Sequence, residues 1–377
     1  MEVPKRIGID AQLWNETGVG RYIRNLVLQL SKIDITNQYV LFLRKREFDN
    51  ITIPGANFTK VLADFKWHGF AEQLFFPSVL KREKLDIMHF PYFSVPILYN
   101  RPFVITIHDL ILHHFSTGQA STLPKWFYTC KLGVYKFVIQ YAATHAKKII
   151  TVSDATKDQI LDDLHAPLEK IVVTSEGIDT QIVVTENVLP QTENIVTNPY
   201  FLYVGNAYPH KNLYTLIKAF REFQKKYPIA QLILVGKEEF FYKRLKRVVA
   251  GMGVNNIIFT GFIPDNDLSY LYSHAVATIV PSLMEGFGLP ALEAMTHNCV
   301  VLASDITVLH EICGESAFYC LPTDSNDMNK KMKEIYNAKK SVIEEKKKRA
   351  TERLSLFSWE KMAKRTKEVY ESSISIR

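Results

Sequence analysis

Two glutamates, Glu285 and Glu293, stand eight positions apart in the segment PSLMEGFGLPALEAM. Two glycines and Pro290 lie between them, and the apolar run ATIVPS precedes them. Proline is favoured in the first turn of a helix, so we expect a helix over 290–297 with Glu285 in the loop before it. Backbone N–H groups at a helix start suit a phosphate, and a carboxylate beside them accepts hydrogen bonds from hydroxyl groups. The pattern therefore indicates a site for a sugar nucleotide.

An acidic helix start stabilised by the helix dipole is the simpler interpretation of these two side chains. It accounts for Glu293 but gives no role to Glu285 or to the glycines. We therefore expect Glu285 to orient the donor sugar and Glu293 to hold ribose hydroxyls. The donor diphosphate is expected at the helix start, against Phe287, Gly288 and Leu289.

A second candidate is Lys211, which follows YFLYVGNAYPH and precedes the helical pattern NLYTLIKAF. A lysine at a helix start adds positive charge where the dipole is already positive, which favours a bound anion. The alternative is a surface lysine whose stem lies along apolar neighbours. We expect Lys211 to bind the donor phosphates as a catalytic residue, with the loop residues Gly205 and Asn206 beside it.

The loops that follow the next two strands are the candidates for nucleotide recognition. Gly236 and Lys237 end the run AQLILVG, and Phe262 follows NIIFTG. A second positive charge on the diphosphate would come from Lys237 or from Arg21 in the first half of the chain. The sequence does not choose between these two.

The segment NETGVGRYIRNL places Gly18 and Gly20 before an amphipathic helix. A single G-x-G is compatible with a phosphate loop and equally with a tight strand-to-helix turn. We expect it to form a wall of the donor site, with Arg21 reaching the phosphates.

A cluster of candidates concerns the acceptor side and the transferred sugar. His108 and Asp109 follow the strand pattern FVITI, and His89 ends IMHF. Ligands of open α/β sheets bind beyond the carboxyl ends of the strands, so His108 is expected at the transferred sugar. We expect Trp14, His89 and Asp109 on the acceptor side, with a packed histidine as the alternative for His89. The neighbouring His113 and His114 match no standard metal spacing, and we expect neither metal nor cofactor.

Short β-branched runs alternate with helical patterns along the whole chain, which predicts parallel βα units. Strands are expected at RIGID, YVLFL, KVL, IMHF, FVITI and KKIITV, and then at YFLYVG, AQLILVG, NIIFTG, ATIVPS and CVVLAS. Helices are expected over 20–32, 70–82, 124–145, 212–227, 239–252, 266–274 and 290–297. The polar segment 185–198 resembles a linker. The prediction is an α/β protein with two doubly wound, Rossmann-like domains facing a central cleft, an N-terminal one over 1–185 and a C-terminal one over 195–355.

Composition narrows the class of protein. The chain has 377 residues, 47% hydrophobic and 23% charged, which is typical of globular domains. No run approaches the length of a membrane-spanning helix, no signal peptide precedes the first strand pattern, and the four cysteines form no metal or C-x-x-C pattern. We expect a cytoplasmic protein with reduced thiols.

The net charge of +7 is concentrated at the C-terminal end, where residues 329–377 carry 15 basic and 7 acidic side chains, a difference of +8. A solvated helix face explains this segment, and peripheral contact with the anionic inner face of a plasma membrane is the alternative. No motif for nucleic-acid recognition accompanies the charge. The stretch 124–148 combines lysines with aromatics and is either a helix covering the sheet or an interfacial helix that would suit a lipid-linked acceptor.

Taken as a block, EGFGLPALEAM resembles the E-x7-E motif of the retaining glycosyltransferase family 4, which has the GT-B fold. TGVGRY, TIHDL, IITVSDATKDQI, VTSEGID and YVGNAYPHKNL are similar to other motifs of that family and occur in its order. FSWEKMAKRTKEVYE resembles its terminal helix, which implies that 356–377 cross back to the N-terminal domain. Lys211 matches the phosphate-binding lysine and His108 the histidine near the transferred sugar. The chain has Gly205-Asn206-Ala207 where relatives often carry a second basic residue.

The resemblance implies transfer of a hexose from a nucleotide sugar, with retention of configuration, to a glycan or lipid-linked acceptor. A front-face route is implied, in which the leaving phosphate takes the proton of the acceptor and domain closure excludes water. The N-terminal segment IGIDAQLWNETGVGRYIRNL resembles mannosyltransferases of bacterial surface-polysaccharide assembly, so GDP-mannose is the expected donor. A UDP-sugar is the alternative donor. A sugar-nucleotide epimerase, a phosphorylase and a non-catalytic binding protein are the alternative functions.

Overall fold

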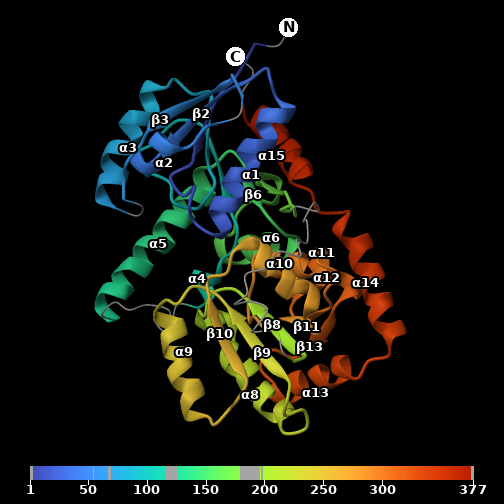
Figure 1. Cartoon of the computed structure of the whole chain (residues 1–377). Coiled ribbons are helices and arrows are strands. Elements are labelled where there is room, and N and C mark those ends of the chain that lie inside the picture. The colour runs from blue at the N-terminus through green and yellow to red at the C-terminus, as the bar shows by residue number, and fades with distance from the viewer. Residues whose placement is uncertain are drawn as a thin grey trace. The chain divides into compact units, whose positions relative to one another are not determined.

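The computed structural model describes residues 3–53, 55–66, 69–115, 125–178, 196 and 198–374 (Figure 1). The chain forms two compact units. Unit 1 comprises Met1–Gly177 with Ser358–Arg377, and unit 2 comprises Ile178–Phe357. The expected linker, 185–198, lies almost entirely outside the described residues.

Unit 1 is built on a seven-stranded parallel sheet in the order β3-β2-β1-β4-β5-β6-β7. Its strands are β1 (Arg6–Asp10), β2 (Gln38–Leu43), β3 (Phe58–Leu62), β4 (Ile87–Phe90), β5 (Phe103–Ile107), β6 (Ile149–Thr151) and β7 (Ile171–Val173). Its helices are α1 (Gly18–Ile33), α2 (Lys45–Asn50), α3 (Phe70–Arg82), α4 (Ile111–His114), α5 (Lys125–His145), α6 (Asp154–Leu164) and α15 (Trp359–Ser373), with a 3₁₀ turn at Leu168–Lys170. Central strands such as FVITI are buried along their whole length because helices cover both faces of a parallel sheet.

The last helix, α15, belongs to the core of unit 1 although it follows unit 2 in the chain. It packs against α1, as Figure 1 shows for the red and blue helices. Trp359, Met362 and Tyr370 are buried in one cluster with Tyr22 and Leu26 of α1. Apolar residues at helical spacing on both helices create this contact.

Unit 2 is built on a six-stranded parallel sheet in the order β10-β9-β8-β11-β12-β13. Its strands are β8 (Tyr200–Val204), β9 (Gln231–Val235), β10 (Ile257–Gly261), β11 (Ala277–Val280), β12 (Val301–Ser304) and β13 (Phe318–Cys320). Its helices are α8 (Leu213–Gln224), α9 (Phe240–Gly251), α10 (Asp265–His274), α11 (Leu289–Thr296), α12 (Thr307–Cys313), α13 (Ser325–Tyr336) and α14 (Lys340–Leu354), with 3₁₀ turns at Pro209–Lys211 and Gly314–Ser316.

Each sheet reverses its strand order once, between β1 and β4 in unit 1 and between β8 and β11 in unit 2. In doubly wound sheets the ligand binds beyond the carboxyl ends of the strands at such a reversal. The expected fold class, two Rossmann-like parallel sheets, is therefore confirmed, and the two reversals locate the candidate sites.

The strands and helices expected from periodicity are present, with ends shifted by a few residues. Several elements were not predicted: α2, α4, α6, α12, α13, β7 and β13. The expected solvated helix near residues 344–353 is α14. Within the described residues, no helix combines the length and apolar character that crossing a membrane requires.

Candidate active site

The carboxyl ends of β8 and β11 bring two predicted residues of unit 2 into contact. Nζ of Lys211 lies 2.7 Å from Oε1 of Glu285. Oγ of Ser282 donates to the same carboxylate oxygen at 2.6 Å. Glu285 is buried, with 7% of its surface exposed. A buried, hydrogen-bonded ion pair of this kind is typical of a site that binds charged groups.

Backbone and amide hydrogen bonds tie the two loops together. Asn212 adopts the left-handed conformation, with φ of 60°, and starts α8. Its Nδ2 donates to the carbonyl oxygens of Pro281 at 2.9 Å and Pro322 at 2.6 Å. The N–H of Leu283 donates to the carbonyl of His210 at 2.8 Å. Asparagine tolerates the left-handed region, so Asn212 turns the chain and holds Lys211 against the second loop.

The charges of this pair set the protonation of the site. Burial raises the pKa of Glu285, but the positive charge of Lys211 and the hydrogen bonds from Lys211 and Ser282 outweigh it and bring the pKa below its ordinary value of 4.5. Burial, followed by the charge of Lys211, lowers the pKa of His210 to about 4. At neutral pH the site therefore holds a carboxylate beside a neutral histidine.

The glycine-rich loop ends at the start of α11. Gly288 has φ of 103° and its Cα faces Leu309, whose Cδ2 would lie 2.9 Å from an added Cβ. Phe287 is buried against the Phe357 ring, with ring centroids 5.6 Å apart, so it would meet a donor through its backbone. Leu289 is the first residue of α11.

Glu293 lies in α11, where the OH of Tyr272 donates to its Oε2 at 2.9 Å. The side chain is half-buried. It therefore has a defined orientation, which suits the role predicted for it at a ribose. The chemical role itself stays a prediction.

Glycines at the ends of β8 and β9 allow the two strands to approach closely. A Cβ on Gly236 would lie 2.1 Å from the carbonyl oxygen of Gly205. The OH of Tyr242 donates to that same carbonyl at 2.9 Å. Gly205 itself has φ of 150°, and the carbonyl of the following Asn206 accepts from the OH of Tyr203 at 2.6 Å. The loop beside Lys211 is thus fixed by two buried tyrosines.

The other two residues predicted for nucleotide recognition are exposed. Lys237 follows β9 and Phe262 follows β10, with 73% of Phe262 exposed. An aromatic ring at the carboxyl end of a strand offers a face on which a base can stack. Both residues stand at the sheet edge that the sequence predicted.

In unit 1, His108 follows β5 and each of its ring nitrogens lies within hydrogen-bond distance of an oxygen atom. Its Nε2 lies 3.0 Å from the carbonyl oxygen of Pro91, so Nε2 carries a proton and donates. Its Nδ1 lies 3.2 Å from Oε1 of Glu176, an interaction that requires a proton on either partner. Tyr22 contacts the ring edge to face at 4.8 Å. The carbonyl oxygen of His108 accepts from Oγ1 of Thr156 at 3.5 Å.

His89 is fully buried, which favours the packed alternative over the acceptor-side role. Its Nδ1 lies 2.6 Å from the OH of Tyr370 and its Nε2 lies 2.8 Å from Oγ1 of Thr106. Burial, and then the nearby His108, lowers its pKa to about 3. The neutral ring links β4 to α15. Among the other acceptor-side candidates, Asp109 is half-buried and accepts from the N–H of Ile111 at 2.9 Å.

The segment TGVGRY forms the start of α1. A Cβ on Gly20 would lie 2.6 Å from the carbonyl oxygen of Trp14, so this glycine permits close packing of the preceding loop. Gly18 is exposed at the first position of α1, and no atom lies within 4 Å of an added Cβ. Burial lowers the pKa of Arg24, and the positive charge of the half-buried Arg21 lowers it further. The tight-turn interpretation thus explains Gly20 but not Gly18.

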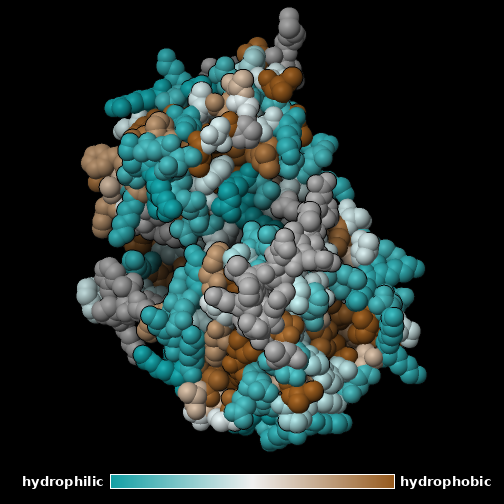
Figure 2. Space-filling model, viewed as in Figure 1, coloured by the Kyte–Doolittle hydropathy of each residue, from teal (hydrophilic) through white to brown (hydrophobic). Residues whose placement is uncertain are grey.

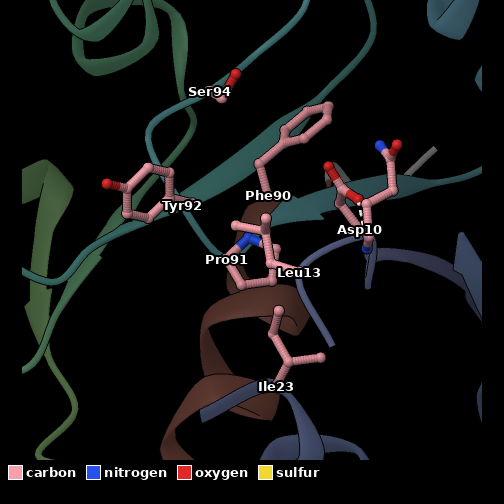
Figure 3. Close-up of a pocket in the computed structure, with 8 residues that line it drawn as sticks. Asp10, Leu13, Ile23, Phe90, Pro91, Tyr92 and Ser94 are labelled. Atoms are coloured by element: carbon pink, nitrogen blue, oxygen red, sulfur yellow. Dashed lines mark hydrogen bonds between the residues drawn. The ribbon is translucent and has the colours of Figure 1, made fainter. Parts of the chain in front are cut away.

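A small pocket at the strand reversal of unit 1 was not predicted. Figure 3 shows Asp10 and Leu13 on one side, Phe90, Pro91, Tyr92 and Ser94 along another segment, and Ile23 from α1. Gln12 also lines it, is 4% exposed, and neither of its amide atoms has a hydrogen-bond partner within the described part of the chain.

Asp10 is the charged group of this pocket. Burial raises its pKa to about 6, against the hydrogen bond from the N–H of Gln12, the nearby side-chain amide of Gln12 and the charge of Arg44. Gln12 follows the end of β1 by two positions, which was a weak signal of a site because polar residues there also make turns. Glu176, Asn212 and Ser282 were also missed, although each lies within or beside a quoted motif.

Comparison with known proteins identifies the family of the chain. The family model of group 1 glycosyl transferases matches residues 185–353, and the Glycosyltransferase Family 4 model matches residues 17–182. The O-antigen chain mannosyltransferase RfbU of Salmonella typhimurium is 27% identical over 298 residues, covering 78% of each chain. The O-antigen chain mannosyltransferase B of Escherichia coli is 28% identical over 334 residues, covering 82% of this chain and 84% of that protein.

A solved structure shares the fold of both units. Sucrose-phosphate synthase from Thermosynechococcus elongatus superposes with a TM-score of 0.77 at 20% identity, covering 98% of each chain. The two family models match consecutive stretches that together run from residue 17 to residue 353, so the chain belongs to the glycosyltransferases of family 4 and group 1, which have the GT-B fold.

Proposed function

We propose that this glycosyltransferase transfers a mannosyl unit from GDP-mannose to a saccharide acceptor, with retention of the anomeric configuration. The mannosyl unit is supported by the names of the two relatives, both O-antigen chain mannosyltransferases. The donor site rests on one observation, the buried Lys211–Glu285 pair beside the start of α11.

The two charged groups of the pair are assigned to different parts of the donor. Both hydrogen bonds to Glu285 end on Oε1, so we assign its other carboxylate oxygen to a hydroxyl of the donor sugar. An ammonium group has three N–H donors, and the bond to Glu285 uses one. The remaining two of Lys211 are assigned to diphosphate oxygens, where they stabilise the charge that grows as the sugar leaves.

The start of α11 adds to this stabilisation. At this end the N–H of Leu289 and the positive end of the helix dipole favour an anion, since Pro290 has no N–H and the N–H of Ala291 donates to the carbonyl of Gly288 at 2.9 Å. Together with Lys211 they supply the positive charge, so we propose the step without a metal or cofactor. The leaving diphosphate is assigned as the base that takes the proton of the acceptor hydroxyl. Glu293 is assigned to the ribose.

For the acceptor we propose the pocket at the strand reversal of unit 1. Gln12 offers one amide donor group and one acceptor there, and Asp10 offers a carboxyl group. Buried amides are normally hydrogen-bonded, so an unpartnered one lining a pocket suits a hydroxyl of a sugar. The pocket holds about one water-sized group, which is the size of a hydroxyl.

The test is a panel of GDP- and UDP-sugars, with the released nucleotide and the product measured. We expect turnover with GDP-mannose, an α-configured product from the α-configured donor by NMR, and loss of turnover in Glu285→Ala. Glu334→Ala, which removes an exposed carboxylate of α13, is the matched control and should keep turnover.

Turnover with a UDP-sugar alone would keep the transferase and refute the mannose donor. Inversion of configuration would refute the retaining route. Conversion of a donor into another nucleotide sugar without acceptor would establish an epimerase, and absence of both turnover and nucleotide binding would establish a non-catalytic protein.

A further inference from the structure

Helix α3 presents large apolar side chains to solvent. Phe70 is 90% exposed, Phe75 60% and Leu74 57%. The opposite side of the same helix buries Phe76 and Leu80 in the core of unit 1. A helix at the surface of a protein normally carries polar residues on its outer face, so this outer face is unusual. Figure 2 shows hydrophobic atoms gathered there, at the left of the view.

Helix α5 continues the exposed apolar surface. Trp126, Val134 and Phe137 are 71%, 63% and 61% exposed. With the exposed Cys130 they recur at intervals of three and four residues, which places them on one face of the helix. The face of α5 that packs on the sheet carries other residues, such as Tyr135 and Ile139.

Helices α3 and α5 lie on the same side of unit 1 (Figure 1). The loop that contains Ile97 forms hydrogen bonds with both of them. The N–H of Ile97 donates to Oε1 of Gln73 in α3 at 3.0 Å. The carbonyl oxygen of Ile97 accepts from the OH of Tyr141 in α5 at 2.9 Å. Ile97 and Leu98 are themselves 36% and 53% exposed. We call the exposed apolar residues of α3, the loop and α5 the α3–α5 patch: Phe70, Leu74, Phe75, Ile97, Leu98, Trp126, Val134 and Phe137.

The exposed charges on the two helices are positive. Helix α5 has no aspartate or glutamate in its 21 residues, and its Lys131 and Lys136 are exposed. Helix α3 ends in the exposed Lys81 and Arg82, while its acidic residue, Glu72, is 1% exposed. Apolar aromatics bordered by lysines are the composition of an interfacial helix.

The basic C-terminal helices do not have this character. In α14, Arg349 pairs with Glu345 at 2.8 Å. In α15, Lys364 pairs with Glu360 and Lys367 with Glu371, both at 2.5 Å. These are exposed pairs at helical spacing, which solvate a helix face. Each of these pairs is neutral, and within the described residues neither α14 nor α15 presents a row of exposed aromatics comparable with that of α5.

We propose that the α3–α5 patch binds the surface of an anionic phospholipid membrane, with its aromatics in the headgroup region and its lysines on lipid phosphates. Each aromatic removes apolar area from water, and each lysine is attracted by the negative surface potential. A second copy of the chain is a poorer occupant, since the lysines of two patches would face each other with no exposed acid on α3 or α5 to pair with them. Membrane binding would hold the enzyme beside an acceptor carried on a lipid.

The test uses the full chain and co-sedimentation with vesicles of phosphatidylcholine alone or mixed with phosphatidylglycerol. We expect binding to the mixed vesicles that weakens with salt, and at least a tenfold weaker binding to phosphatidylcholine. Phe70→Ser, Phe75→Ser and Phe137→Ser combined should weaken binding about tenfold or more. Ile229→Ser, Phe240→Ser and Leu321→Ser, which remove exposed apolar side chains of unit 2, are the matched control.

Cys130 gives a second, local readout. It is exposed on α5, whereas Cys299, Cys313 and Cys320 are buried, so an environment-sensitive thiol dye will label it selectively. We expect the fluorescence emission of the dye to shift to the blue when anionic vesicles are added. No shift is expected when the vesicles are added to the triple variant labelled with the same dye.

Equal binding by the patch variant and the control variant would place the membrane contact elsewhere and overturn the proposal. Absence of vesicle binding, with concentration-dependent dimers that the patch variant abolishes, would assign the patch to a second copy. Both readouts are independent of donor turnover, so failure of the proposed function would leave this result standing, and the reverse also holds.

Discussion

Replacing Lys211 by methionine tests the physical basis of the candidate site. The change leaves the buried carboxylate of Glu285 with a hydrogen bond from Ser282 but no opposite charge. The attraction across 2.7 Å is about 6 kcal/mol at an effective dielectric constant of about 20. Removing one partner of a buried pair costs about 3–5 kcal/mol, because the other charge stays buried. Since Ser282 remains, we expect about 3 kcal/mol less unfolding free energy at pH 7.

The loss should depend on pH in a defined direction. In the wild type the folded pKa of Glu285 is lowered, so the stability that the pair contributes is present above pH 4.5 and is lost as the pH falls through the folded value. In the variant, burial without Lys211 raises the pKa of Glu285, so the folded state takes up a proton more readily than the unfolded state. The difference in stability should therefore shrink from pH 7 to pH 5.

The measurement is urea unfolding followed by circular dichroism at both pH values, together with calorimetric titration of GDP. Lys225→Met is the matched control, because Lys225 forms an exposed pair with Glu222 at 2.6 Å. It should cost about 0.5 kcal/mol or less. A loss of this small size in Lys211→Met, or a loss equal at pH 7 and pH 5, would refute the reasoning.

Three further predictions concern glycine packing and the pocket of unit 1. Gly236→Ala places a Cβ 2.1 Å from the carbonyl oxygen of Gly205, so we expect the unfolding free energy to fall by about 2 kcal/mol or more and nucleotide binding to weaken. Gly251→Ala, which has open space around its Cβ, is the control and should be neutral or stabilising in the same unfolding measurement. Gln12→Met should leave the melting temperature unchanged or higher, because it removes an unpartnered amide, yet raise the acceptor KM about tenfold; a large drop in stability would mean that the amide serves the fold. Asp10→Asn should raise the melting temperature at pH 8 and not at pH 4. The pKa of Asp10 is raised to about 6, so at pH 8 the wild type keeps a disfavoured ionised carboxylate in the folded state, and at pH 4 it does not. Equal effects at both pH values would contradict this.

Much of the fold followed from local pattern. Helices cover both faces of a parallel sheet, so a strand such as FVITI is apolar along its whole length and can be identified from this run. The covering helices were identified from apolar residues at intervals of three and four. Short elements such as α4, with four residues, and β13, with three, were missed because so few residues establish no period.

The candidate site followed from sequence to a different degree in each unit. Glu285 and Lys211 were identified separately, each from its place between a strand and a helix. Their direct contact was not predicted, since 74 residues separate them and the order of strands in the sheet decides which loops meet. His89 shows why the end of a strand is an ambiguous signal, because it can also lie beneath a helix such as α15, where the ring is packed.

The sequence by itself determined the class of most long elements, the motif residues and the family. Charge, glycine and proline act over a few residues, so their effect can be read locally. Only the tertiary structure decided that Lys211 neutralises Glu285, that the amide of Gln12 is buried with no partner among the described residues, and that the aromatics of α3 and α5 face solvent. These properties depend on which neighbours remove a side chain from water, and folding brings those neighbours from distant parts of the chain.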